Sequence, residues 1–340
     1  MPGGVVLVSG ISGTGTGDYL QAVVETARAA SHDHAVQVHD VGQIMREYAE
    51  ADNPGVNWDL ILDADEVALR HLRSLALQRV AESVASQPAA LHLIDIHLSF
   101  RWRTYLTRGI DVHALEPFRS KVRCFVNLIQ YLSQLQEQLQ PTSWGDREIL
   151  ALLVWRDEEL FLSTLYADML DRSSCFVLPV AEPPAMLERI IWHPEIRRVY
   201  LSFPITSIQD DHEAREEILH FRDRLREFAV VFDPYASKDY DETYTRPGMS
   251  ALRKEIGEVT EIRDYRFIDQ AEAVVVYCPK RVPSKGVDAE MAHARKTGKS
   301  IYVYCPEDLG GGPFAVAPTH FRSNPDQYLT LLMEHLGPRS

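Results

Sequence analysis

The sequence predicts an α/β protein of two domains, each a parallel sheet flanked by helices. The chain has 340 residues, which exceeds the length at which one hydrophobic core usually keeps growing. It opens with a strand-like run, a glycine-rich turn and a helical pattern. Its second half alternates short apolar runs with segments of helical spacing, which is typical of a parallel sheet covered by helices.

The first domain is expected to extend to residue 182. Apolar runs of strand length and segments with apolar residues three to four positions apart define its elements. They are strands at Val5–Ser9, Leu91–Ile96 and Cys175–Val180, and helices after Asp18, over Val122–Leu139 and over Glu148–Leu170.

Pro183 and Pro184 interrupt regular structure, because proline removes a backbone donor and disfavours helix in the residue before it. We therefore place a second domain over residues 183–340. Its expected strands are Val199–Phe203, Val230–Phe232, Ala273–Cys278 and Ser300–Tyr304, and its expected helices are His212–Phe228 and Asp288–Lys296.

Composition limits the partners and the compartment. The formal charge of −14 disfavours long nucleic acid, but it permits a small phosphorylated ligand. The four cysteines form no pair with metal-ligand spacing, so we expect reduced thiols and no metal. No basic leader precedes the first strand and no apolar run spans a bilayer, so a cytoplasmic protein without membrane contact is expected.

Three segments of the second domain carry candidate chemistry, and two of them follow expected strands. In open α/β sheets, ligands bind beyond the carboxyl ends of strands, so these loops are expected to meet in one crevice. The segments are Val199–Ile205, Ile262–Tyr265 and Pro283–Ala294.

Glu290 is expected in the first turn of a helix, where the dipole keeps a carboxylate ionised and able to attack an anomeric carbon. Ser284 and Gly286 precede it, where a hydroxyl, a close glycine backbone and free helix N–H groups suit a phosphate. Further substrate-binding candidates are Pro204, Ile205 and Asp233.

These segments resemble the nucleoside 2-deoxyribosyltransferase superfamily, especially its 2′-deoxynucleoside 5′-phosphate N-hydrolase branch. The resemblance covers about a third of the chain and rests on Arg263-Asp264, the strand at 273–276 and Pro-Ser-x-Gly-Val-x-x-Glu at 283–290. It implies a flavodoxin-like or Rossmann-like fold, no cofactor, and a homo-oligomer that completes the pocket across an interface.

The resemblance also implies roles for single residues. Glu290 attacks the sugar, Asp264 assists the departing base, Ser284 contacts the 5′-phosphate and Tyr200 lines the sugar site. Transferases of the superfamily usually have aspartate where this chain has Ser284, which favours hydrolysis of a phosphorylated substrate.

The sequence departs from that family at two positions, and its candidates have plainer interpretations. Phe203 replaces a small residue, and Thr206 replaces the arginine of the hydrolase branch.

The candidate residues also have purely structural interpretations. Asp264 can simply pair with Arg263, Ser284 can be an ordinary helix-start residue, and Tyr200 can merely pack. Deoxyribosyl transfer, NAD glycohydrolysis and a non-enzymatic nucleotide sensor therefore remain alternatives to nucleotide hydrolysis.

The N-terminal loop follows a strand and precedes a helix, the setting in which backbone N–H groups hold phosphate. Its residues Gly10, Gly13 and Gly15, with Asp95 at the end of a strand, resemble P-loop nucleotide kinases of the archaeal adenylate kinase type. The lysine expected after Gly15 is Thr16, and the magnesium-binding Ser/Thr is Gly17.

Loss of the loop lysine removes a main cation from a transferring phosphoryl group. We therefore expect ATP or another nucleotide to bind this loop with weak or no kinase activity, while an unorthodox kinase remains a third hypothesis. Nearby arginines are interpreted as a solvated basic stretch rather than as phosphate ligands; they are Arg101, Arg103 and Arg108.

Overall fold

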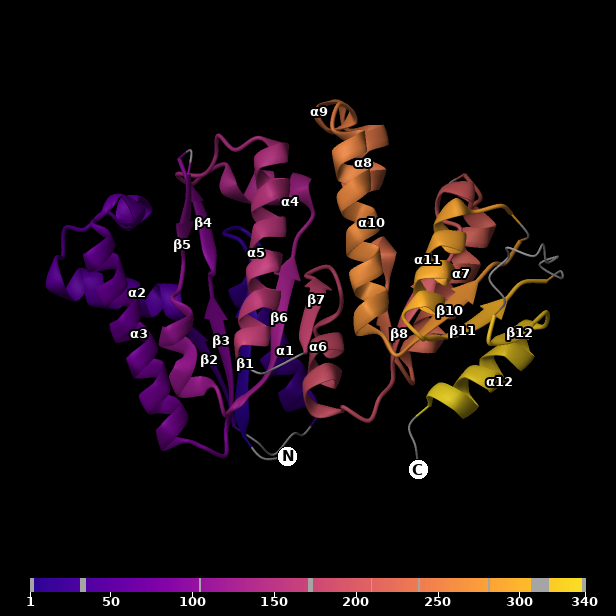
Figure 1. Cartoon of the computed structure of the whole chain (residues 1–340), viewed down its shortest axis with the longest axis horizontal. Coiled ribbons are helices and arrows are strands. Elements are labelled where there is room, and N and C mark those ends of the chain that lie inside the picture. Colours follow the sequence, from indigo (N-terminus) through magenta and orange to yellow (C-terminus); the bar gives the residue numbers. More distant parts are fainter. Residues whose placement is uncertain are drawn as a thin grey trace. The chain divides into compact units, whose positions relative to one another are not determined.

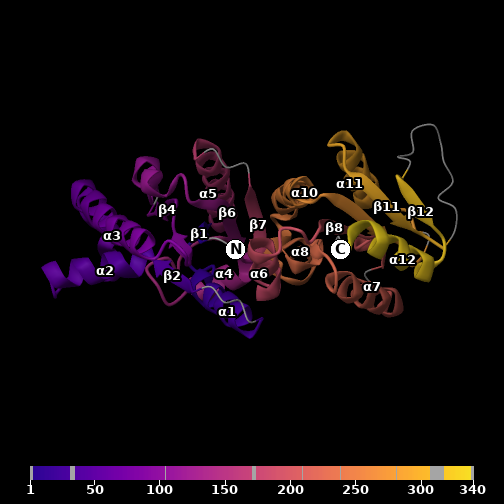
Figure 2. The same ribbon diagram turned by 90° about the horizontal axis from the view of Figure 1, so that it is seen from below.

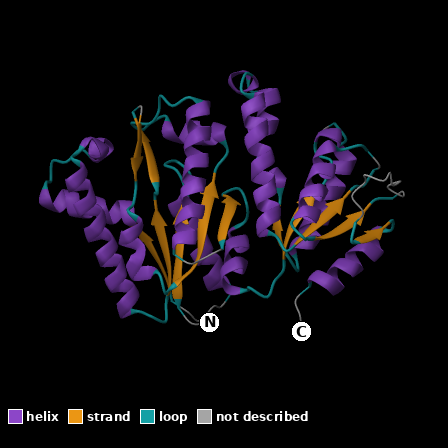
Figure 3. Ribbon diagram, viewed as in Figure 1, coloured by secondary structure: helices purple, strands orange, loops and turns teal. Residues whose placement is uncertain are grey.

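The structure is a computed structural model, and it describes residues 3–30, 35–103, 105–170, 174–208, 210–237, 239–280, 282–306 and 318–337. The chain divides into two compact units. Unit 1 comprises Met1–Ala185 and Ser237–Ile256, and unit 2 comprises Met186–Ala236 and Gly257–Ser340. Each unit contains a parallel sheet with helices beside it (Figures 1 and 3), which confirms the predicted fold class.

Unit 1 is built on a five-stranded sheet in the order β2-β3-β1-β6-β7, in which every neighbouring pair is parallel. The strands are β1 (Gly4–Ser9), β2 (Val36–Asp40), β3 (Leu91–Ile96), β6 (Val122–Ile129) and β7 (Cys175–Pro179). A small antiparallel pair, β4 (Ser99–Trp102) and β5 (Tyr105–Arg108), follows β3.

The helices of unit 1 pack on both faces of this sheet. One face is covered by α2, α3 and α5, whose buried residues share a core cluster with the strands, and α1 lies on the other (Figure 2). Their bounds are α1 (Thr16–Ala29), α2 (Val41–Asp52), η1 (Trp58–Asp63), α3 (Glu66–Ser86), η2 (Val112–Phe118), α4 (Leu132–Leu139) and α5 (Ile149–Met169).

The expected helix over Val122–Leu139 is wrong in its first half. Val122–Ile129 is the strand β6, which is buried along nearly its whole length between β1 and β7. A strand buried on both faces shows a continuous apolar run, and such a run lacks the alternation that distinguishes it from a helix. Helix begins only at Leu132.

Unit 2 has its own five-stranded parallel sheet in the order β12-β11-β10-β8-β9. The strands are β8 (Arg198–Ser202), β9 (Val230–Phe232), β10 (Ala273–Tyr277), β11 (Ser300–Tyr304) and β12 (His320–Arg322). The four strands expected in this half of the chain are all present.

Helices α7 and α12 bury their apolar faces against one side of the sheet of unit 2, and α11 packs on the other (Figure 2). The helical segments are α6 (Pro184–Trp192), η3 (Thr206–Ile208), α7 (His212–Arg226), η4 (Pro234–Ala236), α10 (Arg253–Gln270), α11 (Lys285–Lys296) and α12 (Pro325–Leu336). No helix in the described ranges is long and apolar enough to cross a membrane.

The division of the chain differs from a single boundary at 182/183, because the first crossing lies at 185/186 and a later segment returns to unit 1. The segment Ser237–Ile256, which carries α8 (Asp239–Thr245) and α9 (Pro247–Ser250), belongs to unit 1 although its flanks belong to unit 2. Its anchor is buried Asp239, which accepts the backbone N–H of Leu132 at 2.7 Å and pairs with Arg156 at 2.7 Å. Nothing in the local sequence of 237–256 indicates that pairing, because both partners lie about a hundred residues away.

Candidate functional site

The site of unit 2 begins with the alternation of side chains along β8. Val199, Leu201 and Phe203 point into the core formed with α7 and α12. Because successive side chains of a strand point to opposite faces, Tyr200 and Ser202 project together from the other face. Both are fully buried.

Glu290 reaches these two side chains from α11. Tyr200 donates its hydroxyl to Glu290 Oε1 at 2.8 Å, and Ser202 donates to Oε2 at 2.5 Å. Each carboxylate oxygen therefore has its own donor on one strand. This arrangement fixes the orientation of the carboxyl group while its side chain stays only partly buried.

The expectation that the helix dipole keeps Glu290 ionised is wrong. Helix α11 begins at Lys285, so Glu290 is in its second turn, beyond the region where the dipole acts strongly. The pKa of Glu290 is raised to about 8, chiefly by burial and next by the negative charge of Asp264, although the hydrogen bonds from Ser202 and Tyr200 lower it. At neutral pH the protonated form therefore predominates in the free protein.

Asp264 is the second acid of the site. It lies on α10 beside Arg263, whose Nε and Nη2 both donate to Asp264 Oδ1, at 3.1 and 2.9 Å. Burial raises the pKa of Asp264, against the opposing effect of Arg263. The predicted pairing of Asp264 with Arg263 is thus present. Asp264 is also close enough to Glu290 and Tyr200 for its charge to raise the pKa of both.

Ser284 and Gly286 lie at the start of α11. Ser284 is the N-cap residue, and its Oγ accepts the backbone N–H of Val287 at 3.3 Å. Gly286 is the second residue of the helix. An accepting hydroxyl keeps its own proton for a further bond, so the capping role leaves Ser284 a donor for a ligand at this helix end.

The other substrate-binding candidates serve visible structural roles. Pro204 is buried after β8, and Ile205 packs against the core cluster of unit 2. Asp233 is buried after β9, where it accepts the N–H of Tyr235 at 2.8 Å and pairs with Arg222 at 3.2 Å. Its charge also raises the pKa of Asp264, so it lies near the acids without contacting Glu290 in any described bond.

Sequence reasoning missed three residues around the acids. Ser202 was recoverable, because it stands two positions after Tyr200 on the same face of a strand. Tyr265 and His293 stack with ring centroids 4.4 Å apart, next to Asp264 and one turn beyond Glu290. No local pattern signals that stack, because it joins α10 to α11.

In unit 1 the glycine-rich loop has the backbone of an anion-binding turn. Gly13 and Gly15 have φ of +83° and +81°, a region that disfavours other residues, and α1 begins directly afterwards at Thr16. His97 donates Nδ1–H to the carbonyl of Gly10 at 2.6 Å, which fixes the start of the loop. The α1 N-terminus offers N–H groups, but Thr16 supplies no cation.

Asp95 is the penultimate residue of β3, in register with Val8 of β1. Burial raises its pKa well above the usual value, and the charges of Asp40 and Glu159 add to the effect. Its Oδ1 has no hydrogen-bond partner among the described residues, and neither has Thr14 Oγ1 in the loop. These groups suit a nucleotide with a cation, although the lysine and the magnesium-binding hydroxyl are replaced.

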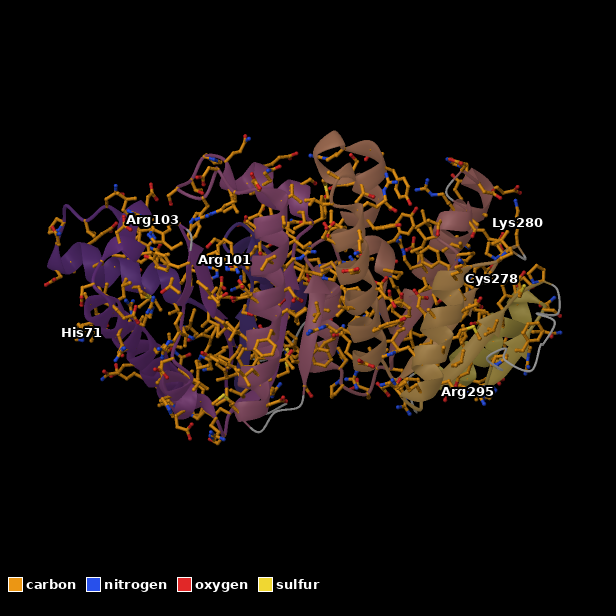
Figure 4. The ribbon with its side chains drawn as sticks, turned by 45° about the horizontal axis from the view of Figure 1, so that its top comes forward. His71, Arg101, Arg103, Cys278, Lys280 and Arg295 are labelled. Atoms are coloured by element: carbon orange, nitrogen blue, oxygen red, sulfur yellow. The ribbon has the colours of Figure 1, made fainter. Side chains whose placement is uncertain are left out.

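The arginines near the loop are engaged in ion pairs. Figure 4 labels Arg101 and Arg103 in unit 1. Arg101 pairs with Glu158, and Arg103 pairs with Asp63 at 2.6 Å. Arg108 pairs with Asp111 at 2.8 Å. Arg103 and Arg108 are more than half exposed, in agreement with a solvated stretch, whereas Arg101 is only 30% exposed.

No family model matches the chain, and the search of curated proteins gives no match. Among solved structures, the chain is similar to a sugar kinase from a Janibacter species, at 16% identity over 56% of this chain and 92% of that one, with a TM-score of 0.31. It is also similar to a shikimate kinase from Bacteroides thetaiotaomicron, at 14% identity, 55% and 97% coverage and a TM-score of 0.34. A shikimate kinase from Acinetobacter baumannii, in complex with shikimate, matches at 12% identity, 62% and 96% coverage and a TM-score of 0.32. Likeness at this level carries no inference about activity.

Proposed function

We propose that unit 2 hydrolyses the N-glycosidic bond of a nucleoside 5′-monophosphate or a related nucleotide, and releases the free base. The observation that carries the proposal is the Glu290 carboxyl group, held on both oxygens by Tyr200 and Ser202 with a second acid, Asp264, close by. Two carboxyl groups of which one attacks and one moves a proton are the requirement of a retaining glycosidase.

In the first step, ionised Glu290 attacks the anomeric carbon of the sugar. A C–O bond forms to the carboxylate as the C–N bond to the base breaks, and the bonding electrons leave with the base nitrogen. The hydroxyls of Tyr200 and Ser202 hold the carboxylate in the attacking geometry, which lowers the entropic cost of reaching it.

Asp264 supplies the proton that the departing base requires. In the reactive form Glu290 is ionised and Asp264 carries the proton, and burial raises the pKa of Asp264 in favour of this form. Both Arg263 donors contact Oδ1, so Oδ2 carries the transferable proton. The product of this step is a glycosyl ester of Glu290 and an ionised Asp264.

Water completes the reaction. Asp264 removes a proton from water, the oxygen attacks the anomeric carbon, and Glu290 leaves as a carboxylate. The ionised Asp264 of the first step becomes the acid again, so the two steps balance in protons and electrons without a metal or cofactor. A nucleobase in place of water would give base exchange, which is the transferase alternative.

The phosphate assignment rests on Ser284 at the N-terminus of α11. Its hydroxyl proton and the unpaired N–H groups of the first helical turn favour an anion there. The family resemblance adds a homo-oligomer to the proposal, which sedimentation of the purified protein tests.

The direct experiment incubates purified protein with nucleosides, nucleoside 5′-monophosphates, 2′-deoxy counterparts and NAD, followed by chromatography for free base. The proposal expects base from a monophosphate without added metal. Base release only when a second base is supplied identifies a transferase, and nicotinamide release identifies an NAD glycohydrolase. If no substrate yields base, unit 2 is a ligand-binding module and the proposal fails.

A further inference from the structure

Unit 1 contains a cavity of about 390 Å³, and the candidate residues of unit 2 take no part in it. It lies between the glycine-rich loop, α2, η1, α3 and the chain around β4 and α4. Its size falls within the roughly 300–1,000 Å³ of small-molecule sites. The reaction proposed for Glu290 does not use it.

Aromatic side chains form much of its wall. Trp58, Phe100 and Trp144 line it and are only partly buried, so flat apolar surface faces the cavity. Trp144 packs against Trp102, which also lines the cavity, and against Trp155, with ring centroids 5.0 and 4.9 Å away. Trp102 is held in turn by its Nε1–H, which donates to Asp63 at 2.7 Å. A wall that is already ordered binds a ring at low entropic cost.

Three lining residues carry a charge, Arg73, Asp40 and Asp59, and no described ion pair joins Arg73 to either carboxylate, so the charge of Arg73 is compensated poorly. The side chain of Arg73 is 7% exposed, and its ion-pair partner is Glu66, 3.5 Å away and itself 47% exposed. Its Nη2 has no hydrogen-bond partner among the described residues. Burial lowers the pKa of Arg73, and the charges of Arg108 and Arg70 lower it further although Glu66 opposes them. Two more guanidinium groups therefore lie near Arg73. A buried cation with so little compensation favours an anion.

We propose that this cavity binds a planar-ring ligand that bears one anionic group, with the ring against Trp144 and Phe100 and the anion at Arg73. A nucleoside monophosphate and an aromatic carboxylate share this chemistry. Binding requires neither magnesium nor ATP, and it is independent of the glycosidase activity proposed for unit 2.

Intrinsic fluorescence gives a local readout, because four of the five tryptophans belong to unit 1. The full-length chain carrying Glu290→Gln, which prevents turnover, is titrated with AMP and with indole-3-acetate, and binding is repeated by calorimetry. Adenosine and indole are the uncharged counterparts. The proposal expects at least one anion to bind saturably and about ten- to a hundredfold more tightly than its uncharged counterpart, since a bond to a charged group is lost.

Arg73→Gln should remove that difference. The control is Arg79→Gln, on the same helix but exposed and paired with Glu47, which should leave it intact. AMP binding alone identifies a monophosphate site and indole-3-acetate binding alone a carboxylate site. The proposal is overturned if neither anion binds, if the uncharged counterparts bind equally well, or if Arg73→Gln changes nothing. Should Arg73→Gln fail to fold, the comparison of indole-3-acetate with indole still decides.

Discussion

At the scale of single residues, the central feature is a competition over the proton of Glu290. Two hydroxyl donors favour its ionised form, whereas burial and Asp264 oppose it and prevail, with the pKa at about 8. The same carboxyl group is thereby oriented for attack and kept largely neutral near pH 7. Its reactivity should then depend on pH in a way that an exposed glutamate cannot show.

Glu290→Gln should abolish base release while leaving the fold intact. An amide of the same shape can accept from one of the two hydroxyls and donate its N–H to the other, but it cannot form the covalent intermediate, so turnover should fall by orders of magnitude. The measurement is base release by chromatography beside a circular dichroism spectrum. Glu334→Gln, an exposed change on α12, is the matched control. Retention of more than about a tenth of the wild-type rate would remove Glu290 from the nucleophile role.

The specificity constant for base release should rise with pH as Glu290 ionises around its pKa of about 8, because only the ionised carboxylate attacks, and it should fall again at higher pH as Asp264 loses the proton that the departing base requires. Ser202→Ala removes a donor to that form. The rise should move to higher pH by about one unit, the equivalent of one charged hydrogen bond. A pH–rate profile of both proteins tests this, and an unchanged profile in the variant would show that Ser202 does not position the carboxylate.

At the scale of elements, the start of α11 combines a cap with a proposed phosphate site. Ser284→Ala should destabilise the protein by about 0.5–2 kcal/mol through loss of the cap. It should also lower the specificity constant for a monophosphate about ten- to a hundredfold, while the parent nucleoside changes little.

Ser284→Asp separates the two roles of this residue. Aspartate caps a helix as well as serine does, yet its charge repels a phosphate. Thermal unfolding should therefore remain near wild type while the preference for monophosphates is lost. An equal fall for both substrates in Ser284→Ala would mean that Ser284 only supports the helix.

The elements show what the sequence could predict. Short apolar runs located four of the five strands of unit 2, since each is bounded by turn residues or a helical pattern, but they did not predict β12, which has only three residues. They failed at Val122–Ile129, because a strand buried on both faces lacks a period. Glu290, Tyr200 and Asp264 lie in motifs that the sequence shows, but the raised pKa of Glu290 could not be predicted from the sequence. That property depends on burial and on a neighbour from another helix, which no local segment records.

At the scale of the whole molecule, the segment 237–256 completes unit 1 by supplying the carboxylate that pairs with buried Arg156. Asp239 is 1% exposed and faces Arg156, whose side chain is 8% exposed. Glu137 and Arg246 join the same two parts of the chain, but their side chains are 64% and 47% exposed. These two ion pairs should differ greatly in their contribution to stability.

Asp239→Asn should lower the unfolding free energy of unit 1 by about 3–5 kcal/mol, because it leaves Arg156 as an uncompensated buried charge. Glu137→Gln should cost about 0–1 kcal/mol, as exposed pairs do. Urea denaturation followed by tryptophan fluorescence measures both. A loss of similar size in the two variants would mean that the buried pair contributes no more than the surface pair.

The discontinuity of unit 1 also affects the order of its synthesis. The chain passes between the units at 185/186, 236/237 and 256/257. A ribosome therefore completes the sheet of unit 1 long before it makes Asp239, and until then Arg156 lacks its carboxylate partner. The nascent first 185 residues should consequently be the stage most exposed to aggregation and to chaperone binding. For the same reason, one proteolytic cut near residue 185 cannot release unit 1 whole, and a fragment ending there lacks the segment that neutralises its buried arginine.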